Sequence, residues 1–226
     1  MLLGDFHMHT YYSKDCNVRP EDLVRRAQQV GLTCIAVTDH NSIAGAQAVQ
    51  RIAPFRVIIA EEIGTLDGEI TGLFLKEPVP KGLPPREAVR RVKEQGGLVS
   101  IPHPFDRIRR SPMTHAVLKD ILPDIDLVEV FNARTTLPSD VARCRAFAEE
   151  HALIKSGGSD AHTCYELGGI RIEFPDFDGT PQGFKEAMRH ATIRGHLASP
   201  FVHVASKYAK WCKKLGLLPR HPETTL

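Results

Sequence analysis

The feature that most constrains this chain is a repeated order along the sequence: a short apolar run, then acidic or histidine residues, then a segment with helix-start signals. The uncharged run 33–38 is followed directly by Asp39 and His40, and the run 56–60 leads to Glu62. Strands that alternate with helices predict a mainly parallel sheet, either an α/β barrel or a doubly wound sheet. In such barrels, residues at the carboxyl ends of the strands converge on one face.

The earliest of these strand ends carries a pair of histidines. Residues 1–3 begin a predicted buried strand, and Asp5, His7 and His9 follow at spacings of two. Residues two apart on a strand point to the same face, so these three side chains are predicted to project together. A lone histidine pair also arises from packing or chance, and a metal site requires partners from elsewhere in the chain.

Partners of the right kind stand at the ends of the later predicted strands. Chance would place one or two histidine or carboxylate residues there, whereas here nearly every strand end has one. This recurrence favours a metal site over packing. The set expected to converge is His7, His9, His40, Glu62, His103, Asn132, Asp160 and His162, with Asp15 in the first loop.

The bulk composition is that of an ordinary globular protein, with 226 residues, of which 42% are hydrophobic and 25% charged. A single barrel domain can have this length. The formal net charge of +2 gives no argument for nucleic-acid or membrane binding. Five cysteines without a CxxC pair predict free thiols in a reducing cytoplasm. Neither a signal peptide nor an apolar run of roughly 20 residues is apparent, so we expect no transmembrane segment.

Five motifs, taken in order, resemble those of the PHP (polymerase and histidinol phosphatase) superfamily. They lie at residues 5–10, 38–40, 62–63, 101–104 and 159–162, so the resemblance covers most of the chain. It implies a distorted (β/α)7 barrel with a cluster of two or three divalent metal ions at the C-terminal face of the strands. It also implies hydrolysis of phosphoesters.

The same resemblance implies a role for each strand-end residue. Glu62 is expected to bridge two metals, and it is preferred to Glu61 because the apolar Ile63 follows it directly. The implied ligand groups are His7, His9, Glu62 and Asp160 for the first metal, Glu62 and His103 for the second, and Asp15, His40 and His162 for the third.

Asn132 and Asp15 depart from the family pattern, because members with three metals often carry histidine at these positions. Aspartate is an ordinary replacement ligand. Asparagine is a weaker, neutral one, so Asn132 is expected either to bind the second metal or to contact only the surrounding side chains or the substrate. Mixed imidazole and carboxylate ligands suit zinc, manganese or iron, and the sequence does not choose among them.

The chemistry expected of such a centre is hydrolysis by a metal-activated hydroxide. Bound metals lower the pKa of water and neutralise phosphoryl oxygens, so no covalent protein nucleophile is needed. His40 or His162, where not committed to a metal, is expected to protonate the leaving alkoxide.

Two arginines follow strand ends and are expected to bind the substrate phosphate. Arg107 lies four residues past His103, and Arg134 lies two residues past Asn132. Arginine suits this role because its guanidinium matches phosphate oxygens with two parallel hydrogen bonds. The alternative for Arg107 is a solvated, salt-bridged loop, and the neighbouring arginines at 109–110 are not ranked.

The last part of the chain, residues 196–226, is expected to form a unit distinct from a barrel domain at residues 1–195. Apolar residues at spacings of three and four predict a helix. We expect this helix to dock on the barrel with its lysines in solvent, and contact with an anionic surface or nucleic acid is the alternative. The apolar stripe consists of Phe201, Val204, Tyr208, Trp211 and Leu215.

These features predict a metal-dependent phosphoesterase that hydrolyses a small phosphorylated metabolite, such as a nucleotide. A 3'-5' exonuclease or oligonucleotide phosphodiesterase is the first alternative, although nucleic acid is not favoured because basic residues gather only in the arginine loop and the tail. A non-catalytic, metal-stabilised module is the second alternative, and the nearly complete set of ligands counts against it. The sequence does not indicate the oligomeric state.

Overall fold

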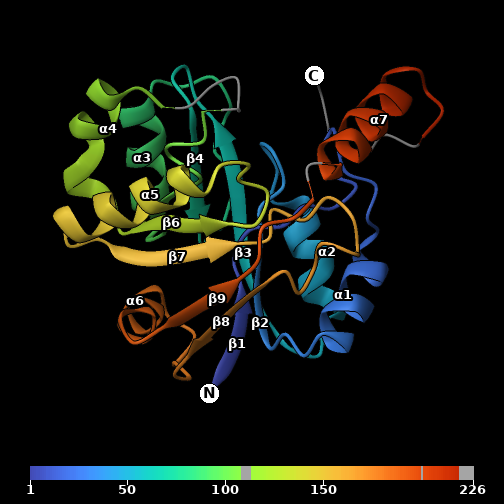
Figure 1. Cartoon of the computed structure of the whole chain (residues 1–226), viewed down its shortest axis with the longest axis horizontal. Coiled ribbons are helices and arrows are strands. Elements are labelled where there is room, and N and C mark those ends of the chain that lie inside the picture. Colours follow the sequence, from blue (N-terminus) through green and yellow to red (C-terminus); the bar gives the residue numbers. More distant parts are fainter. Residues whose placement is uncertain (108–112, 200, 219–226) are drawn as a thin grey trace.

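The computed structural model describes residues 1–107, 113–199 and 201–218 (Figure 1). These residues form one nine-stranded sheet in the order β7-β6-β5-β4-β3-β2-β1-β8-β9. The strands are β1 (Leu2–Asp5), β2 (Cys34–Val37), β3 (Arg56–Gly64), β4 (Glu69–Leu73), β5 (Leu98–Ile101), β6 (Leu127–Asn132), β7 (Ile154–Gly158), β8 (Ile170–Phe174) and β9 (Thr192–Gly195).

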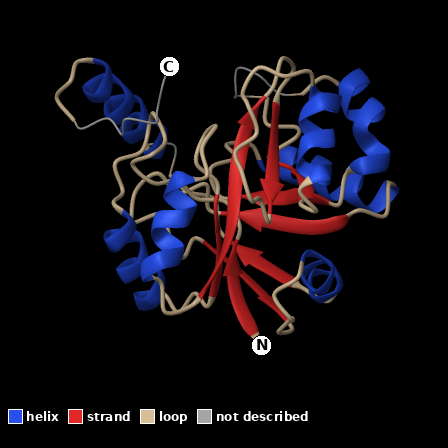
Figure 2. Ribbon diagram, turned by 180° about the vertical axis from the view of Figure 1, so that it is seen from behind, coloured by secondary structure: helices blue, strands red, loops and turns tan. Residues whose placement is uncertain are grey.

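Among the described residues, five helices cover the outer side of this sheet, whereas α6 packs against side chains of its inner side. Figures 1 and 2 show α1 and α2 along one flank and α3, α4 and α5 along another, with α6 near β7 and α7 set apart near the C-terminus. The helices are α1 (Pro20–Gln29), α2 (Ala44–Ile52), α3 (Pro85–Glu94), α4 (His115–Ile121), α5 (Pro138–Glu150), α6 (Pro181–Arg189) and α7 (Val202–Lys214).

The sheet curls into a nearly closed barrel. β1, β2 and β3 run parallel, as do β5, β6 and β7, whereas β4 is antiparallel to both of its neighbours. Beyond β1 and β7, Met8 forms a parallel bridge with Ala161, and the His9 amide donates to the Ala161 carbonyl at 2.9 Å. β8 pairs antiparallel with β1 on the edge away from β2, and β9 pairs with β8, so these two strands extend the sheet past β1. The expected distorted (β/α)7 barrel is confirmed.

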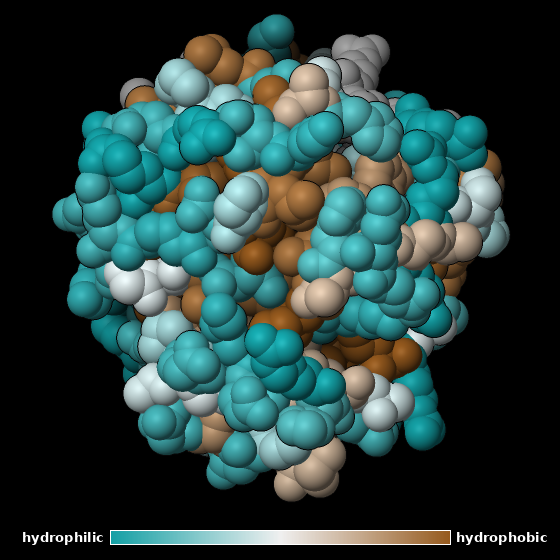
Figure 3. All heavy atoms as spheres, turned by 90° about the vertical axis from the view of Figure 1, so that its left-hand side faces the viewer, coloured by the Kyte–Doolittle hydropathy of each residue, from teal (hydrophilic) through white to brown (hydrophobic). Residues whose placement is uncertain are grey.

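Aromatic side chains fill the barrel end that lies away from the candidate ligands. Phe174 and Phe184 are fully buried, and their ring centroids lie 5.5 and 5.0 Å from that of Phe6 in edge-on contacts. Burial of each such ring contributes roughly 1.5–3 kcal/mol to stability. On the side of the molecule that carries α4 and α5, polar side chains cover most of the surface, and apolar ones show in the hollows between them (Figure 3).

Three elements of the structure were not predicted from the sequence, and one strand is longer than its apolar run. The three elements are α4, β8 and β9, and β3 continues beyond the apolar run 56–60 to Gly64. Serine is a preferred N-cap, so Ser42 is expected to cap the helix that follows it, but α2 begins one residue later, with Ile43 as its cap. Asn41 adopts a φ of 55°, and the Ser42 hydroxyl accepts a hydrogen bond from the Ala44 amide at 3.2 Å. All five cysteines are free, as expected.

The C-terminal helix packs with a different face from the one that the sequence predicts. In the apolar stripe, Phe201, Tyr208 and Trp211 are 80%, 63% and 56% exposed. Cys212 and Lys213 on the other face are buried, so the expectation of lysines in solvent is wrong for Lys213. Within the described ranges, no helix is long and apolar enough to cross a lipid bilayer. The domain boundary at residue 195 stays a prediction.

Candidate metal centre

The first two histidines lie just beyond the end of β1. His7 and His9 are 2% and 1% exposed. Asp5, the last residue of β1, does not join them, because its Oδ1 accepts hydrogen bonds from the amides of Ser159 at 2.9 Å and His7 at 3.4 Å. Burial raises the pKa of Asp5 to about 7 against the effect of these hydrogen bonds. Asp5 therefore ties the end of β1 to the end of β7.

Glu62 occupies the middle of the cluster, where β3 presents its fully buried carboxylate. Its Oε2 lies 3.5 Å from Nε2 of both His7 and His9. The same oxygen lies 3.1 Å from Nδ1 of His40, and Oε1 lies 3.1 Å from Nε2 of His103. One carboxylate thus touches four histidines from three different segments of the chain, which is the arrangement expected of a bridging ligand.

Glu61 points the other way, because successive residues of a strand face opposite sides. Its Oε2 accepts a hydrogen bond from the Val79 amide at 2.8 Å. Burial raises the pKa of Glu61 to about 8, and the hydrogen bond from Val79 only partly offsets this effect. Of the two adjacent glutamates, only Glu62 therefore faces the histidines.

Asp160 joins the cluster from the chain beyond β7. Its Oδ1 lies 3.2 Å from Nε2 of His9 and 3.6 Å from Nε2 of His7, and its amide donates to the His7 carbonyl at 2.7 Å. Asp160 and His103 adopt positive φ angles of 53° and 30°. Residues other than glycine with positive φ are uncommon, and such strained conformations cluster at functional sites.

Asp15, His40 and His162 form a second group at the edge of the cluster. Asp15 Oδ2 lies 3.6 Å from Nε2 of His40, and Asp15 Oδ1 lies 3.5 Å from Nε2 of His162. His9 connects this group to the first, because its ring centroid lies 4.7 Å from that of His40 and 4.3 Å from that of His162. All the residues of the three implied ligand groups therefore lie in one contiguous cluster.

The cluster fits divalent metal ions. Ligand atoms of His7, Glu62 and His103 lie within 4.8 Å of one another, and so do those of His9, His40 and His162. His7 Nε2 and Glu62 Oε2 are buried and have no hydrogen-bond partner among the described residues. A buried polar atom without a partner costs about 1–3 kcal/mol, and a cation would remove this cost. Imidazole and carboxylate donors together suit first-row transition metals.

The electrostatics of the cluster also favour a cation. Burial would lower the pKa of His40, but the carboxylates of Asp15 and Glu62 raise it to about 10. Burial would raise the pKa of Glu62, but His40 and His7 hold it well below its usual range. The carboxylates thus draw protons onto the histidines, and a metal ion must compete with these protons. Metal affinity is therefore expected to fall at low pH.

Two glutamates near the cluster were not identified from the sequence. Glu69 lies at the start of β4, and its Oε1 lies 3.7 Å from Nδ1 of His40. Because β4 is antiparallel, its first residue meets the carboxyl end of β3 at Gly64. The Asp67-Gly68 turn, which indicates the hairpin, was the signal that could have placed Glu69 here.

Glu129, in the middle of β6, is the second of these glutamates and orients candidate ligands through hydrogen bonds. Its Oε1 lies 3.1 Å from Nδ1 of His7, and its Oε2 accepts hydrogen bonds from the His103 amide at 2.8 Å and from Nδ2 of Asn132 at 3.1 Å. A carboxylate on the far nitrogen of a ligating histidine fixes the orientation of the ring. No sequence signal marks Glu129, because it does not stand at a strand end.

Asn132 and Arg134 contact candidate ligands through their side chains. Nδ2 of Asn132 donates to Asp160 Oδ2 at 3.2 Å, and Oδ1 accepts from the Arg134 amide at 2.9 Å. The Arg134 guanidinium is buried, with NH1 2.7 Å from Nδ1 of His162. A metal-binding role for Asn132 and a phosphate-binding role for Arg134 stay predictions, and both side chains are also placed to position candidate ligands.

Arg107 is occupied by a contact with the start of α5. Its Nε lies 2.9 Å from Asp140 Oδ1, and its NH2 donates to Ser139 Oγ at 3.0 Å. The Arg107 side chain is 56% exposed, whereas Asp140 is fully buried. This geometry favours the ion-pair alternative over phosphate binding. Residues 109 and 110 lie outside the described residues.

We expect the substitution Arg107→Ala to have little effect. A half-exposed ion pair is worth about 0–1 kcal/mol, so the melting temperature should fall only slightly and kcat/KM should change less than about threefold. The measurements are thermal melts, metal content and steady-state kinetics on the best substrate. A loss of tenfold or more in kcat/KM with unchanged metal content would instead support phosphate binding by Arg107.

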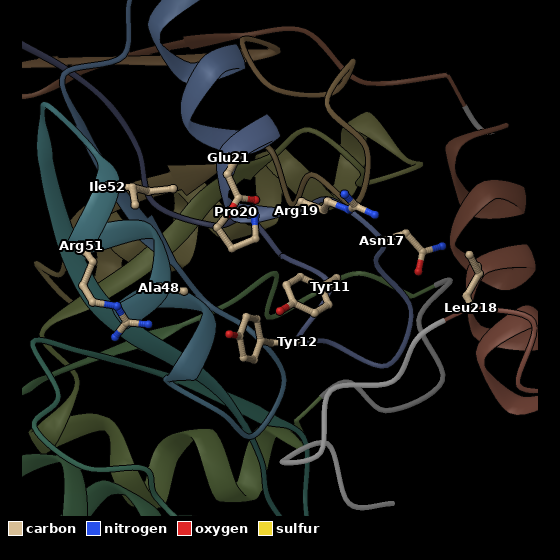
Figure 4. Close-up of a pocket in the computed structure, with 10 residues that line it drawn as sticks. All are labelled: Tyr11, Tyr12, Asn17, Arg19, Pro20, Glu21, Ala48, Arg51, Ile52 and Leu218. Atoms are coloured by element: carbon tan, nitrogen blue, oxygen red, sulfur yellow. The ribbon is translucent and has the colours of Figure 1, made fainter.

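A surface pocket of about 680 Å³ lies beside the loop that precedes α1 (Figure 4). None of the residues that line it is a candidate metal ligand, so this pocket is distinct from the cluster. It is lined by Tyr11, Tyr12, Asn17, Arg19, Pro20, Glu21, Ala48, Arg51, Ile52 and Leu218.

The fold and the cluster together define a class, a distorted α/β barrel with a candidate multi-ion centre at the carboxyl ends of its strands. The sequence profile of the PHP domain matches residues 5–75, and that of the PHP-associated family matches residues 138–193. One uncharacterized protein of Methanocaldococcus jannaschii is 41% identical over 147 residues, or 58% of this chain and 82% of the relative. The chain belongs to the PHP superfamily.

A second relative and one solved structure are also similar to this chain. A second uncharacterized protein of Methanocaldococcus jannaschii is 35% identical over 177 residues, which is 77% of this chain and 71% of the relative. A two-domain protein of Bacteroides vulgatus that contains a predicted PHP-like metal-dependent phosphoesterase has a similar fold, with a TM-score of 0.71 at 19% identity. That similarity covers 92% of this chain and 69% of the other.

Proposed function

We propose that this chain hydrolyses a small phosphorylated metabolite, a nucleotide or similar phosphomonoester, at a centre of two or three divalent metal ions. The observation that carries the proposal is the buried convergence of histidine and carboxylate atoms around Glu62. Membership of the PHP superfamily supports it. Zinc, manganese or iron bound there would supply an acidic water and positive charge for phosphoryl oxygens at neutral pH.

Each group of residues has a proposed task in this reaction. Glu62 joins two ligand groups, while Glu129 holds the ring of His7 and the backbone of His103 in place. Glu69 lies close enough to His40 to complete that side of the cluster. The proposed ligands are His7, His9, Asp15, His40, Glu62, His103, Asp160 and His162, with Asn132 as a weaker candidate.

Proton transfer to the leaving group is assigned to the edge of the cluster. The side chains of His40 and His162 are 11% and 5% exposed, so they lie nearer to solvent than His9, whose side chain has no exposed surface. An imidazole at this edge that holds a proton can donate it to a leaving alkoxide. His40 or His162, whichever is not committed to a metal, is therefore the proposed general acid.

The test is elemental analysis of the purified protein, followed by assays of phosphate release. The substrates are nucleoside monophosphates, sugar phosphates, histidinol phosphate and a single-stranded oligonucleotide. We expect at least two metal ions per chain, release of phosphate from a monoester, and loss of activity on removal of the ions with a chelator.

Two other outcomes would contradict the proposal. Cleavage of the oligonucleotide with no monoesterase activity would support a nuclease, and its binding should then weaken steeply with salt because phosphate contacts release counterions. Full metal content with no hydrolysis of any phosphoester would support a non-catalytic module.

A further inference from the structure

Lys213 is a buried lysine whose ammonium group bonds to the backbone of another segment. It lies near the end of α7 and is 5% exposed. Its Nζ donates hydrogen bonds to the carbonyls of Tyr11 and Ser13 at 2.7 Å each and of Cys16 at 2.5 Å. An ammonium group has three N–H donors, so these contacts match its full capacity. Burial of a charge is costly without such partners, which indicates a specific contact.

The three carbonyls belong to the loop that carries Asp15. Three carbonyl oxygens that converge on one point repel one another, and a cationic donor between them removes this repulsion. A second contact also holds this loop, because the Ser13 hydroxyl donates a hydrogen bond to Asp39 Oδ1 at 2.7 Å. Without the ammonium group, the loop that carries Asp15 would lose these three hydrogen bonds to α7. Lys213 therefore sets the position of this candidate ligand without touching a metal.

Arg134 connects the beginning of α7 to a second candidate ligand. Its side chain is 4% exposed, and its NH2 donates to the Val202 carbonyl at 2.8 Å and to Ser206 Oγ at 2.7 Å. Its NH1 lies 2.7 Å from Nδ1 of His162. Nε lies 3.0 Å from Oε1 of Glu166. The guanidinium group is thus held between α7 and the His162 segment.

Both contacts lead to the same pair of ligands. Asp15 and His162 face each other, with Asp15 Oδ1 3.5 Å from His162 Nε2. Asp15 Oδ1 has no hydrogen-bond partner among the described residues, as expected of an atom placed for a cation. Asn17 and Leu218 line one pocket and lie near each other in Figure 4, so the chain beyond α7 also lies beside this loop.

We propose that α7 completes the centre: Lys213 and Arg134 are positioning residues that hold Asp15 and His162 in place for the third metal ion. The inference rests on the proposed function, because it requires that the cluster binds metal ions. It assigns to the C-terminal segment a task that its exposed apolar stripe does not suggest. The first and second ions depend on ligands that α7 does not hold, so they bind without it.

The test compares Lys213→Met with Lys210→Met, because Lys210 lies on the exposed side of the same helix. Both proteins are prepared alongside the parent chain, loaded with manganese, dialysed and analysed for ions per chain. We expect three ions in the parent and in Lys210→Met. In Lys213→Met, we expect two ions, or an affinity for the last ion that is at least tenfold weaker, with the other two retained.

Further variants separate positioning from general stability. Lys213→Arg keeps the charge and donors, so it should restore part of the third site. Ser206→Ala removes a single hydrogen bond to Arg134 and should weaken the last ion to a smaller degree. It serves as the test if Lys213→Met does not fold. Thermal melts of every variant show whether the loss of an ion accompanies unfolding.

The outcomes distinguish the two proposals. If the parent chain binds no metal, both the proposed function and this inference fail. If the parent binds only two ions, or if Lys213→Met keeps three with unchanged affinity, this inference fails alone. A lower melting temperature with a proportional loss of every ion would make Lys213 a residue of stability only, which would also overturn the inference.

Discussion

Replacing Glu62 by glutamine should abolish hydrolysis and release most of the bound metal. Glu62 contacts four histidines, and its Oε2 is buried without a hydrogen-bond partner among the described residues. Glutamine has nearly the same shape but no charge, so it cannot offset the cations that a bridging carboxylate holds. We expect a decrease in kcat/KM of at least 100-fold, measured together with metal content and melting temperature.

Glu61→Gln is the matched control for this experiment. Glu61 is adjacent in sequence and equally buried, but its carboxylate faces the Val79 amide. A glutamine oxygen can accept the same hydrogen bond, so metal content and kinetics should stay within about twofold of the parent. Equal losses in the two variants would show that the effect comes from burial of a glutamate in β3 and would contradict the role of Glu62.

The stability of Glu61→Gln is also expected to depend on pH differently from that of the parent chain. In the folded chain the pKa of Glu61 is raised to about 8, above the 4.5 of an unperturbed glutamate. The folded state therefore keeps a proton that the unfolded state releases, and this group's contribution to stability is lost as pH rises from about 4.5 to about 8. With metals removed from both proteins, Glu61→Gln should gain stability relative to the parent between pH 5 and pH 8. Parallel melting curves at the two pH values would contradict this expectation.

Gly158→Ala should destabilise the barrel and disrupt the first ligand group. Gly158 ends β7, where a Cβ atom would lie 2.0 Å from Cβ and 2.9 Å from Cα of His7. Because the second of these atoms belongs to the backbone, the two strands would have to separate. Overpacking of this kind costs about 1–3 kcal/mol or more. Thermal melts and metal analysis should show a lower melting temperature and a loss of metal at the His7 position.

Gly64→Ala provides the comparison for Gly158→Ala. Gly64 also ends a strand at this face, but a Cβ atom there would meet first the flexible side chain of Asn41, at 3.3 Å. We expect this variant to retain its metal and nearly all of its stability. If Gly158→Ala binds metal as well as Gly64→Ala does, the close approach of β1 and β7 does not control the site.

Much of the cluster followed from sequence because it depends on local chain geometry. His7 and His9 are two residues apart in an extended segment, and period two alone places them on one face. His40, Glu62 and His103 stand just after or at the end of apolar runs, and parallel strands bring such ends to one side of a barrel. The structure places these residues in contact, as the alternation of strands and helices predicts.

Other contacts depend on pairings between distant strands. Glu69 reaches the cluster because β4 runs antiparallel to β3, which brings the beginning of one strand to the end of the other. Glu129 lies in the middle of β6, and it meets His7 only because the chain beyond β1 lies against the end of β7, the neighbour of β6. Neither position has a signal in its own neighbourhood of the sequence.

The sequence pattern by itself therefore determined an alternating α/β fold and most candidate ligands, since short-range periodicity and strand ends encode both. The choice of a barrel over a doubly wound sheet came from the resemblance to the PHP superfamily. Only the tertiary structure decided how α7 packs. A stripe at helical spacing predicts that a helix forms, but it does not identify its partner, and the stripe that contains Trp211 is exposed. Lys213 is buried instead, because three carbonyls of a loop about 200 residues away offset the cost of burying its charge.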